Sequence, residues 1–475
     1  MKTNTLDFDA QALREKILDL AMRGKLVPQD PNDEPASVLL EKIKVEKEQL
    51  IKEKKIKKSK PLAPITDEEK PFDIPDSWEW VRLGDVNTYN SESVHPDRTP
   101  DKTFELYSVP IFPTRKPEII KGEEIRSNKQ AVETGDVLLC KINPRINRVW
   151  KVSNFTDNEN IASTEWIVVR QREITTEYLR YSLMAPYFRN LLQSNVSGVG
   201  GSLTRAKPRE VRNYVLPIPP LSEQSRIAAK IAQLFALLRK VESSTQQYAK
   251  LQTLLKSKVL DLAMRGKLVE QDPHNEPASV LLEKIKAEKK QLVKEGKIKK
   301  SKPLPPITDD EKPFDIPDSW EWVRLGDVVF NYDDQRIPVS LATRRKKEKI
   351  YDYYGASGKI DKIDNYIFSK SLLLISEDGA NLLARNKPIA FIATGKYWVN
   401  NHAHVMDSID VNLLKYISLY INYQKINQYI SGSAQPKLNQ QNLNKIPIPV
   451  SPEGIQKKII NKINSIFVLL NGSSK

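Results

Sequence analysis

The chain of 475 residues is too long for one hydrophobic core, so its length predicts two to four domains. Its 75 Lys and Arg against 60 Asp and Glu give a formal net charge of +15, which favours a polyanionic partner such as DNA or RNA, with lysine-rich surface helices as the alternative. The single cysteine, Cys140, excludes an internal disulfide and a cysteine-based zinc site, and the lack of an apolar run of about 18 residues or of an apolar signal core predicts a cytoplasmic protein without a membrane span.

The first predicted helix ends in the stretch LDLAMRGKLV, residues 18–27, and the same ten residues recur at 260–269. Residues 16–86 align with residues 258–328 without a gap, and ten of these 71 positions differ. A general richness in lysine cannot place PFDIPDSWEWVRLGDV twice in one chain. These segments therefore form a true internal repeat.

A second helix is predicted after each copy of this stretch. In the first copy, Leu39, Leu40, Ile43 and Leu50 form an apolar stripe, and residues 52–60 are strongly basic. The basic end is either a solvated helix face or an arm that faces DNA phosphates.

Each repeat then continues through a proline-rich stretch, LAPITDEEKPFDIP or LPPITDDEKPFDIP, which predicts a semi-rigid linker into the next domain. Trp78 and Trp80 follow the first linker and alternate as in a strand. We expect one or both to anchor an entry strand in the core of that domain.

The two parts that follow the repeats, residues 87–215 and 329–445, show no alignable similarity to each other. We call them the first and the second variable domain. Both are predicted to be mixed α/β domains with many short strands. The apolar runs DVLLCKI, TEWIVVRQ, SLLLIS and PIAFIATG predict buried strands.

A long helix is predicted between the two variable domains. From Ile227 to Leu262 apolar positions recur at alternating spacings of four and three, which is a heptad seam broken only by Thr245 and Gln252. The seam spans ~53 Å at ~1.5 Å per residue, and Gly266 is predicted to end the helix. The pattern favours a helical partner over a helix lying on a globular core. The seam positions are Ile227, Ile231, Leu234, Leu238, Val241, Thr245, Tyr248, Gln252, Leu255, Val259 and Leu262.

The two ends of the chain together make a second copy of the central segment. The tail repeats the segment after residue 216 at shifts of 230 and then 232, and the head repeats it at a shift of 242, so both ends meet at the position of Ser243. This circular repeat predicts pseudo-twofold symmetry, neighbouring chain termini and an antiparallel composite partner for the long helix. That partner would present Ile459, Ile463, Ile466, Leu470, Leu13, Ile17 and Leu20.

The predicted fold class is α+β or α/β, with two mixed α/β domains separated by two long antiparallel coiled-coil helices. The expected boundaries are a conserved helical region at 1–70, the first domain at 71–217, a central coiled-coil region at 218–312, the second domain at 313–449 and a conserved helix at 450–475.

Polar and basic loops in both variable domains have the chemistry that reads DNA base edges. Each residue taken alone is as well explained by a solvated surface, so the prediction is that each domain has such a face. The candidates are Lys141, Arg145, Arg148, Arg205, Lys207 and Arg209 in the first domain, and Arg344, Arg345, Lys346, Lys347, Lys396, Asn400, Asn401 and His402 in the second.

Signatures of catalysis are missing from the sequence. GVGGSLTR has glycines but lacks the Lys-Ser/Thr end of a phosphate loop, and NPRI at Asn143 is not the Asn-Pro-Pro motif of amino-methyltransferases. His402 and His404 suggest a metal site only weakly because no third ligand is in view. Asp136 and Lys141 bear only a superficial likeness to a nuclease site. We therefore expect a reader or adaptor with no catalytic, cofactor or metal site of its own.

The layout resembles the specificity subunit of type I restriction-modification systems, in a subgroup often called type IB. The motifs that carry the resemblance are IPIPPLSEQSRIAAKI, the twin LDLAMRGKLV blocks continuing into DPNDEPAS and DPHNEPAS, and the twin WEWVRLGDV entries. The segments 105–168 and 375–405 also look like target-recognition domains of that family. The resemblance covers essentially the whole chain.

The resemblance implies that each variable domain reads one half of a split, asymmetric site on double-stranded DNA, with the helices fixing the spacer. It also implies two methylation subunits that carry S-adenosylmethionine and methylate adenine N6, and ATP- and Mg²⁺-dependent restriction subunits that join them. The repeated stretch would stay alike because it faces two copies of the methylation subunit, although a helix end packed on its own core would explain it too. Docking candidates are Leu18, Leu20, Met22, Leu260, Leu262 and Met264.

Two other hypotheses remain beside this one. A basic coiled-coil scaffold without sequence-specific DNA binding would explain the helices and the charge. A stand-alone nuclease would require an acidic site that the sequence does not display.

Overall fold

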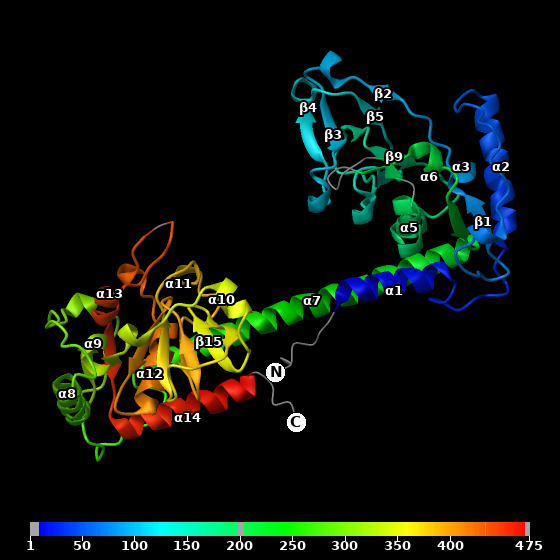
Figure 1. Cartoon of the computed structure of the whole chain (residues 1–475). Helices are drawn as coiled ribbons and strands as arrows, with labels where there is room; N and C mark the ends of the chain where they lie inside the picture. Colours follow the sequence, from blue (N-terminus) through cyan, green and yellow to red (C-terminus); the bar gives the residue numbers. More distant parts are fainter. Residues whose placement is uncertain (1–8, 195, 198–203, 433, 471–475) are drawn as a thin grey trace. The chain divides into compact units, whose positions relative to one another are not determined.

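The computed structural model describes residues 9–194, 196–197, 204–432 and 434–470. They form two compact units, which divide within the long helix α7 (Leu221–Met264) between residues 245 and 246 (Figure 1). We call residues 9–245 the N-terminal unit and residues 246–470 the C-terminal unit. Each unit is a mixed α/β structure that joins one variable domain to the conserved segments around it. The expected proximity of the chain termini concerns residues 1–8 and 471–475, which lie outside the described part.

The N-terminal unit combines a five-stranded sheet, a three-stranded sheet and surrounding helices. The five-stranded sheet has the order β2 (Ser93–Val94), β5 (Lys129–Ala131), β8 (Glu159–Ser163), β3 (Thr103–Tyr107), β4 (Glu118–Lys121), and only β3 and β8 are parallel. The three-stranded sheet is β7 (Val149–Lys151), β6 (Val137–Cys140), β9 (Trp166–Val169). The remaining elements are α1 (Ala10–Met22), α2 (Ala36–Lys52), β1 (Glu79–Arg82), α3 (Leu83–Val86), α4 (Thr176–Met184), α5 (Pro186–Ser194), β10 (Val196–Ser197), β11 (Arg205–Ala206), α6 (Pro208–Val211) and β12 (Val215–Ile218).

The C-terminal unit has a different sheet arrangement on a similar frame. Its four-stranded sheet has the order β14 (Phe330–Asn331), β20 (Ala403–Asp407), β17 (Leu372–Ser376), β18 (Ala390–Ala393). Its three-stranded sheet is β16 (Gly358–Ile363), β15 (Tyr351–Gly355), β19 (Tyr397–Val399), with β15 and β19 parallel. The remaining elements are α8 (Ala278–Lys294), β13 (Glu321–Arg324), α9 (Leu325–Val328), α10 (Leu341–Arg345), α11 (Asn381–Ala384), α12 (Val411–Tyr423), α13 (Gln440–Asn444), β21 (Pro447–Val450) and α14 (Glu453–Leu470).

The frame of each unit is a two-stranded antiparallel sheet made by the strands that enter and leave the variable domain. β1 pairs with β12, with Glu79 opposite Ile218, and β13 pairs with β21, with Glu321 opposite Val450. The chain therefore enters and leaves each variable domain at one place. A different variable domain can be attached to the same frame because only its entry and exit strands must pair with each other.

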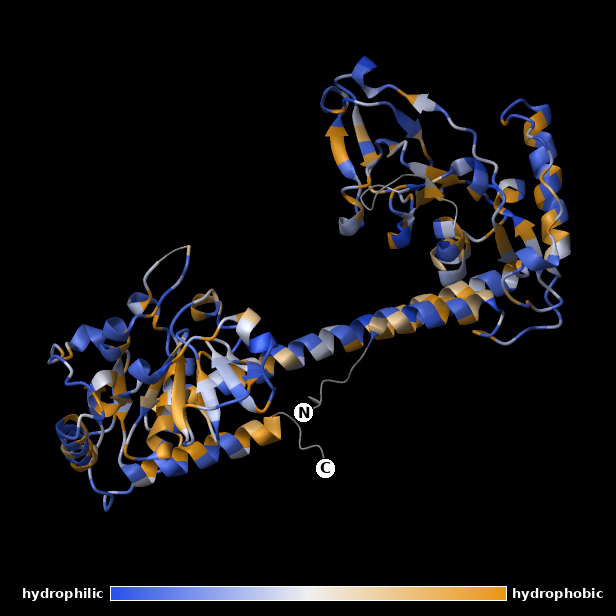
Figure 2. Cartoon of the chain, viewed as in Figure 1, coloured by the Kyte–Doolittle hydropathy of each residue, from blue (hydrophilic) through white to orange (hydrophobic). Residues whose placement is uncertain are grey.

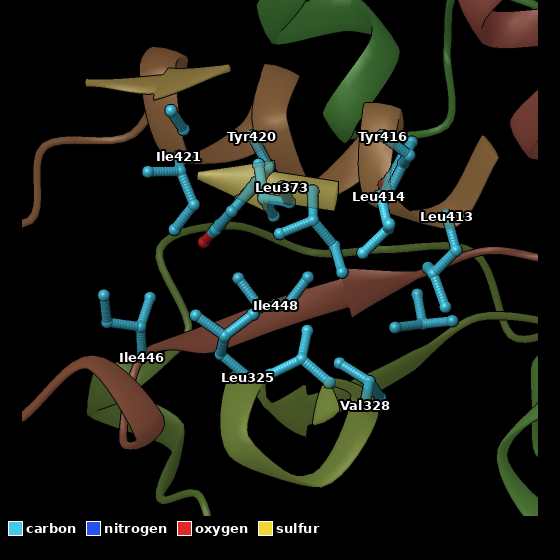
Figure 3. Packing of buried hydrophobic residues seen from close by; sticks show 14 of the residues in the cluster. Leu325, Val328, Leu373, Leu413, Leu414, Tyr416, Tyr420, Ile421, Ile446 and Ile448 are labelled. Atoms are coloured by element: carbon cyan, nitrogen blue, oxygen red, sulfur yellow. The ribbon is translucent and has the colours of Figure 1, made fainter. Parts of the chain in front are cut away.

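The core of the C-terminal unit connects this frame to the variable domain. Ile448 of the frame and Leu325 of α9 are buried in one cluster with Leu373 of β17 and Tyr420 of α12 (Figure 3). Figure 2 shows hydrophobic strands inside this unit and mixed hydropathy along the surface helix α8. The four strands predicted from apolar runs are confirmed as β6, β9, β17 and β18. Since most of their side chains are buried, they required apolar residues at successive positions rather than alternate ones.

The entry strand is anchored by tryptophan, as predicted. The side chain of Trp78 is buried at 3% exposure, and its Nε1 donates to Glu223 of α7 at 2.9 Å. Trp80 is only partly buried and contacts Phe72 and Tyr187. Trp78 is therefore the main anchor between the frame and the long helix.

The predicted long helix is confirmed as α7, a single helix of 44 residues. In the N-terminal unit α1 runs antiparallel to it, because Arg14 pairs with Glu242 while Asp33, beyond the end of α1, pairs with Arg226. In the C-terminal unit α14 runs antiparallel to it, because Gln252 donates to the carbonyl of Leu470 while Lys458 lies 3.7 Å from Asp272. The conserved head and tail each cover one part of α7.

The heptad seam is not continuous, which corrects the prediction. Ile227, Ile231, Leu238 and Val259 are buried, but Val241, Tyr248 and Leu255 are 43–59% exposed. Leu13 of the head is also exposed at 42%, and Leu18, Ala21 and Met22 carry the contacts of α1 in its place. The exposed positions of α7 lie where the described partner helices begin or end, since Arg14 near the start of α1 pairs with Glu242 and Leu470 at the end of α14 accepts from Gln252. In addition, α1 packs on the variable domain as well as on α7, so it turns a different face inward than a two-helix coil requires.

The repeated stretch ends each helix at a glycine that no other residue fits. Gly24 and Gly266 have φ of +65° and +70°, and an added Cβ would lie 2.4 Å from Cγ of Pro75 and 2.5 Å from Cγ of Pro317. The helix stop predicted at Gly266 is confirmed. The proline-rich linker lies directly against this turn, so both positive φ and close approach demand glycine.

The proline-rich linkers are fixed in place by a buried arginine that sequence reasoning missed. Arg82, 4% exposed, donates to the carbonyls of Ala63 and Pro64 and pairs with Glu69 at 2.9 Å. Arg324 does the same in the other unit with Pro305, Pro306 and Glu311. Hydrogen bonds from these arginines lower the pKa of Glu69 and Glu311 to about 2.

Candidate nucleic-acid interface

A strained turn in the first variable domain presents one of the predicted DNA-contacting residues. The turn spans residues 143–148 after β6, and Asn143 and Asn147 flank it, both at φ of +48°. The side-chain amide of Asn147 donates to the carbonyl of Leu183 at 3.1 Å. Arg145 at the tip is exposed. Asparagine tolerates the left-handed region better than most residues, which explains two of them at the ends of one rigid turn.

The structure brings the two candidate stretches of this domain together. An antiparallel bridge pairs Ile142 with Arg205, so the segment 205–209 lies beside the turn. Lys207 and Arg209 are exposed there, and Arg205 is 3.4 Å from Glu165. With Arg145 these side chains form one polar, basic face, which is the chemistry that contacts phosphates and base edges.

Two candidates of this domain have structural partners. The guanidinium of Arg148 donates to the carbonyl of Ile142 at 3.2 Å and so closes the turn on itself. Lys141 is half-buried, and its backbone N–H donates to the carbonyl of Glu165. Arg148 therefore positions the turn, while Arg145 is the member best placed for contact with a ligand.

In the second variable domain Arg344 is held inside the protein, which corrects its prediction as a DNA contact. Its side chain is 12% exposed, pairs with Asp361 at 2.9 Å and lies 4.4 Å from the ring centre of Tyr353. Hydrogen bonds from Lys349 and Arg344 lower the pKa of Asp361. The ion pair with Asp361 therefore engages the guanidinium of Arg344 within this domain. Arg345 and Lys346 are exposed, whereas Lys347 is half-buried and pairs with Asp364 at 2.9 Å.

The loop after β19 contains one further correction. Asn400 is 5% exposed, and its Oδ1 accepts the backbone N–H of His402 at 2.9 Å, so it shapes the loop from inside. Asn401 and Lys396 are exposed, and Lys396 lies 4.7 Å from the ring centre of Tyr366. His402 is half-exposed and 2.7 Å from Asp378. The outward members of this candidate group are Lys396, Asn401 and His402.

A buried polar network supports this loop from below. The ring of His404 is 1% exposed, its Nδ1 lies 2.6 Å from Asp333, and its Nε2 lies 2.7 Å from the carbonyl of Leu438. Burial would raise the pKa of Asp333, but His404 and Arg336 outweigh it and the pKa is lowered. Among the described residues no group of three or more potential metal ligands is found. Both ring nitrogens of His404 face partners within the protein, so its role here is structural.

The proposed docking residues divide into two groups. Leu18, Met22 and Met264 are at most 4% exposed and belong to the cores of their own units, which corrects their prediction as contacts for another subunit. The reason is that α1 and the end of α7 pack on the frame and the variable domain at once. Leu20, Leu260 and Leu262 are partly exposed and remain predictions.

The sequence matches a known family over most of its length. Residues 75–252 and 317–470 each match the family described as type I restriction modification DNA specificity domain. The chain belongs to this family. It is a DNA specificity subunit, and subunits of this type are not catalytic. The two matched segments each contain one variable domain between its entry and exit strands.

Two relatives of this family resemble the whole chain. The type I restriction enzyme EcoEI specificity subunit of Escherichia coli is 34% identical over 97% of this chain and 89% of its own length. The EcoAI specificity subunit of the same species is 33% identical over 98% and 90%.

Solved structures agree with the fold. A chain from a study of complex assembly and conformational transition of the type I R-M system has a TM-score of 0.58 at 20% identity, with 84% of this chain and 92% of that chain covered. The HsdS subunit of Thermoanaerobacter tengcongensis has a TM-score of 0.51 at 20% identity, with 85% and 92% covered. Within the described residues, no helix is both long and apolar enough to cross a membrane.

Proposed function

We propose that each variable domain of this specificity subunit reads one half of a bipartite, asymmetric site on double-stranded DNA. The observation that carries the proposal is the contrast between unlike domains and like frames. The frame strands pair in the same register in both units, while the sheets between them differ in number and order. Two unlike readers on one repeated frame recognise two unlike half-sites, and their specificities add.

The repeated segments are proposed to dock two copies of one methylation subunit. Residues 16–86 and 258–328 differ at ten of 71 positions, although each supports a different domain. Internal packing accounts for buried positions such as Met22 and Met264. It does not account for identical exposed residues, including Lys52 and Lys294 at corresponding positions in the last turns of α2 and α8. A shared partner explains why such surface residues coincide.

The remaining components are assigned to partner subunits. S-adenosylmethionine and adenine N6 methylation belong to the methylation subunits, and ATP and Mg²⁺ to restriction subunits that join through them. The chain itself is proposed to hold no cofactor. The chain is also proposed to act in the cytoplasm.

The test is to co-express the chain with the products of its neighbouring genes and to sequence the methylated positions of the host DNA. A bipartite adenine-methylation motif with a fixed spacer is the expected result. A continuous motif, or methylation without sequence preference, would contradict the proposal and favour a scaffold. Incubating the purified chain with Mg²⁺ and DNA should give no cleavage, and cleavage would point to the nuclease hypothesis.

A further inference from the structure

The N-terminal unit contains a cavity of about 740 Å³ that none of the predicted contact residues led us to expect. Its lining comes from α1, α4, α5 and α7, from β7, and from the loop residues Phe112, Arg115, Ile146 and Asn147. Its volume lies in the range of pockets that hold ligands rather than single ions. We call it the basic groove.

The groove has an excess of positive charge. Its lining holds six cationic side chains and two carboxylates, Glu15 and Glu177, and Arg14 also pairs with Glu242, which lies outside the lining. Arg189 pairs with Glu15 at 2.7 Å, and Lys151 pairs with Glu177 at 2.6 Å. The cationic side chains are Arg14, Arg115, Lys151, Arg180, Arg189 and Arg239.

Two arginines of the groove have no ion pair among the described residues, and these are Arg115 and Arg239. Arg115 lies 4.0 Å from the ring centre of Phe112 and donates to the carbonyl of Val149 at 3.4 Å. Burial and the neighbouring charge of Arg180 lower the pKa of Arg115. Like charges gathered around one cavity repel each other, and an anion between them relieves that repulsion.

The groove adjoins the turn that presents Arg145. Ile146 and Asn147 of that turn line the groove. A nucleic-acid strand whose base is contacted by Arg145 continues past the turn, with one phosphate for every ~3.4 Å of helix axis. Contact with the turn and contact with the groove are therefore compatible on one strand.

We propose that the basic groove binds the phosphate backbone of the DNA half-site read by the first variable domain. This inference rests on the proposed function and adds a positioning contact to it. The groove supplies charge without base information, so it fixes the register of the domain on DNA and leaves sequence choice to the adjoining face. The occupant to be distinguished from DNA is an acidic segment of a partner protein.

The test measures binding of the full chain to a duplex over a range of salt concentrations. Groove variants are Arg115→Asn, which tolerates the φ of +59° at this position, and Arg239→Gln. Matched controls are the adjacent exposed lysines, as Lys116→Gln and Lys240→Gln, which do not line the groove. Arg115→Lys keeps the charge, and thermal melting establishes that each variant is folded.

Each groove variant is expected to bind roughly tenfold more weakly and to lower the slope of log affinity against log salt by about 0.9, the loss of one phosphate contact. The controls should stay close to wild type, and Arg115→Lys should retain most of the slope. The ratio between specific and scrambled duplexes should not change. An unchanged slope in both groove variants, or an equal loss in the controls, would overturn the proposal.

The same titration separates this inference from the proposed function. Wild type that binds specific and scrambled duplexes equally would contradict sequence reading, while a reduced slope on both duplexes in the groove variants would still support the groove. Groove variants that keep the DNA slope but no longer copurify with a methylation subunit would identify a protein segment as the occupant and reject DNA. Failure of wild type to bind any duplex at low salt would contradict both.

Discussion

The length of α7 is predicted to determine the spacer between the two half-sites. Ser243 and Gln247 lie on an exposed stretch of α7 between Glu242, which pairs with α1, and Gln252, which contacts the end of α14. Extra residues inserted after Ser244 therefore disturb neither of these contacts. The length of α7 can therefore be changed without altering either contact.

The magnitude follows from helix geometry. Four inserted residues add ~6 Å and rotate the following chain by ~400°, which is ~40° beyond a full turn. Each base pair adds ~3.4 Å and ~35°. The added translation of α7 corresponds to almost two base pairs and the added rotation to about one base pair. The spacer should therefore grow by one or two base pairs.

A two-residue insertion is the matched control. It adds only ~3 Å but rotates the chain by ~200°, so the second domain would face away from the DNA surface that the first domain reads. We expect methylation to be lost or reduced at least tenfold. Both variants are co-expressed with the methylation subunits, and their motifs are read by sequencing methylated DNA. An unchanged spacer in an active four-residue variant, or full activity of the two-residue variant at the original site, would refute the reasoning.

Three further predictions concern single residues. Gly296→Ala is expected to destabilise the C-terminal unit by about 1 kcal/mol, and Gly266→Ala should destabilise it by clearly more. Both glycines have positive φ, but only Gly266 faces a proline ring. Equal melting temperatures for the two variants would contradict this prediction. Glu311→Gln should lower the free energy of unfolding at pH 7, because the carboxylate paired with Arg324 has its pKa lowered to about 2 and stabilises the fold while it is charged. The difference from wild type should shrink as pH falls from about 4.5 to about 2, where this carboxylate is protonated. A pH-independent difference in urea midpoints would count against this prediction. Arg145→Ala should weaken binding to one half-site by roughly tenfold to a hundredfold and leave binding to the other half-site unchanged. Competition binding with DNA mutated in either half-site would measure both effects. An equal loss at both half-sites would contradict the assignment of Arg145 to one half-site.

The elements of the fold were largely predictable because their signals are local. The apolar runs before Cys140 and before Ser376 specify buried strands whatever domain surrounds them, and they form β6 and β17. The spacing of Ile227, Ile231 and Leu238 likewise specifies one face of a helix, and Gly266 its end. None of these predictions requires knowledge of the tertiary structure.

Which polar residues face outward was not predictable in the same way. Asn400 and Asn401 are adjacent and chemically identical, yet the first is buried in the loop and the second is exposed. Arg344 is neutralised by Asp361, 17 positions away, and His404 meets Asp333, 71 positions away. Such pairings depend on how the elements assemble in the tertiary structure, and no periodic pattern in the sequence predicts them.

The function of the repeated stretch also could not be predicted from the sequence alone. The match of residues 18–27 with 260–269 established duplication but left open whether a partner or the internal core maintained it. The burial of Met22 and Met264 assigns those positions to the core. Their exposed neighbours alone remain available to a second subunit.

Exchange of the second variable domain tests the central claim most directly. Residues 329–445 are replaced by the corresponding segment of a related specificity subunit, which leaves β13 and β21 and their pairing intact. Sequencing of methylated DNA should then show one new half-site, with the other half-site unchanged. A change in both half-sites, or in neither, would contradict two independent readers on a repeated frame.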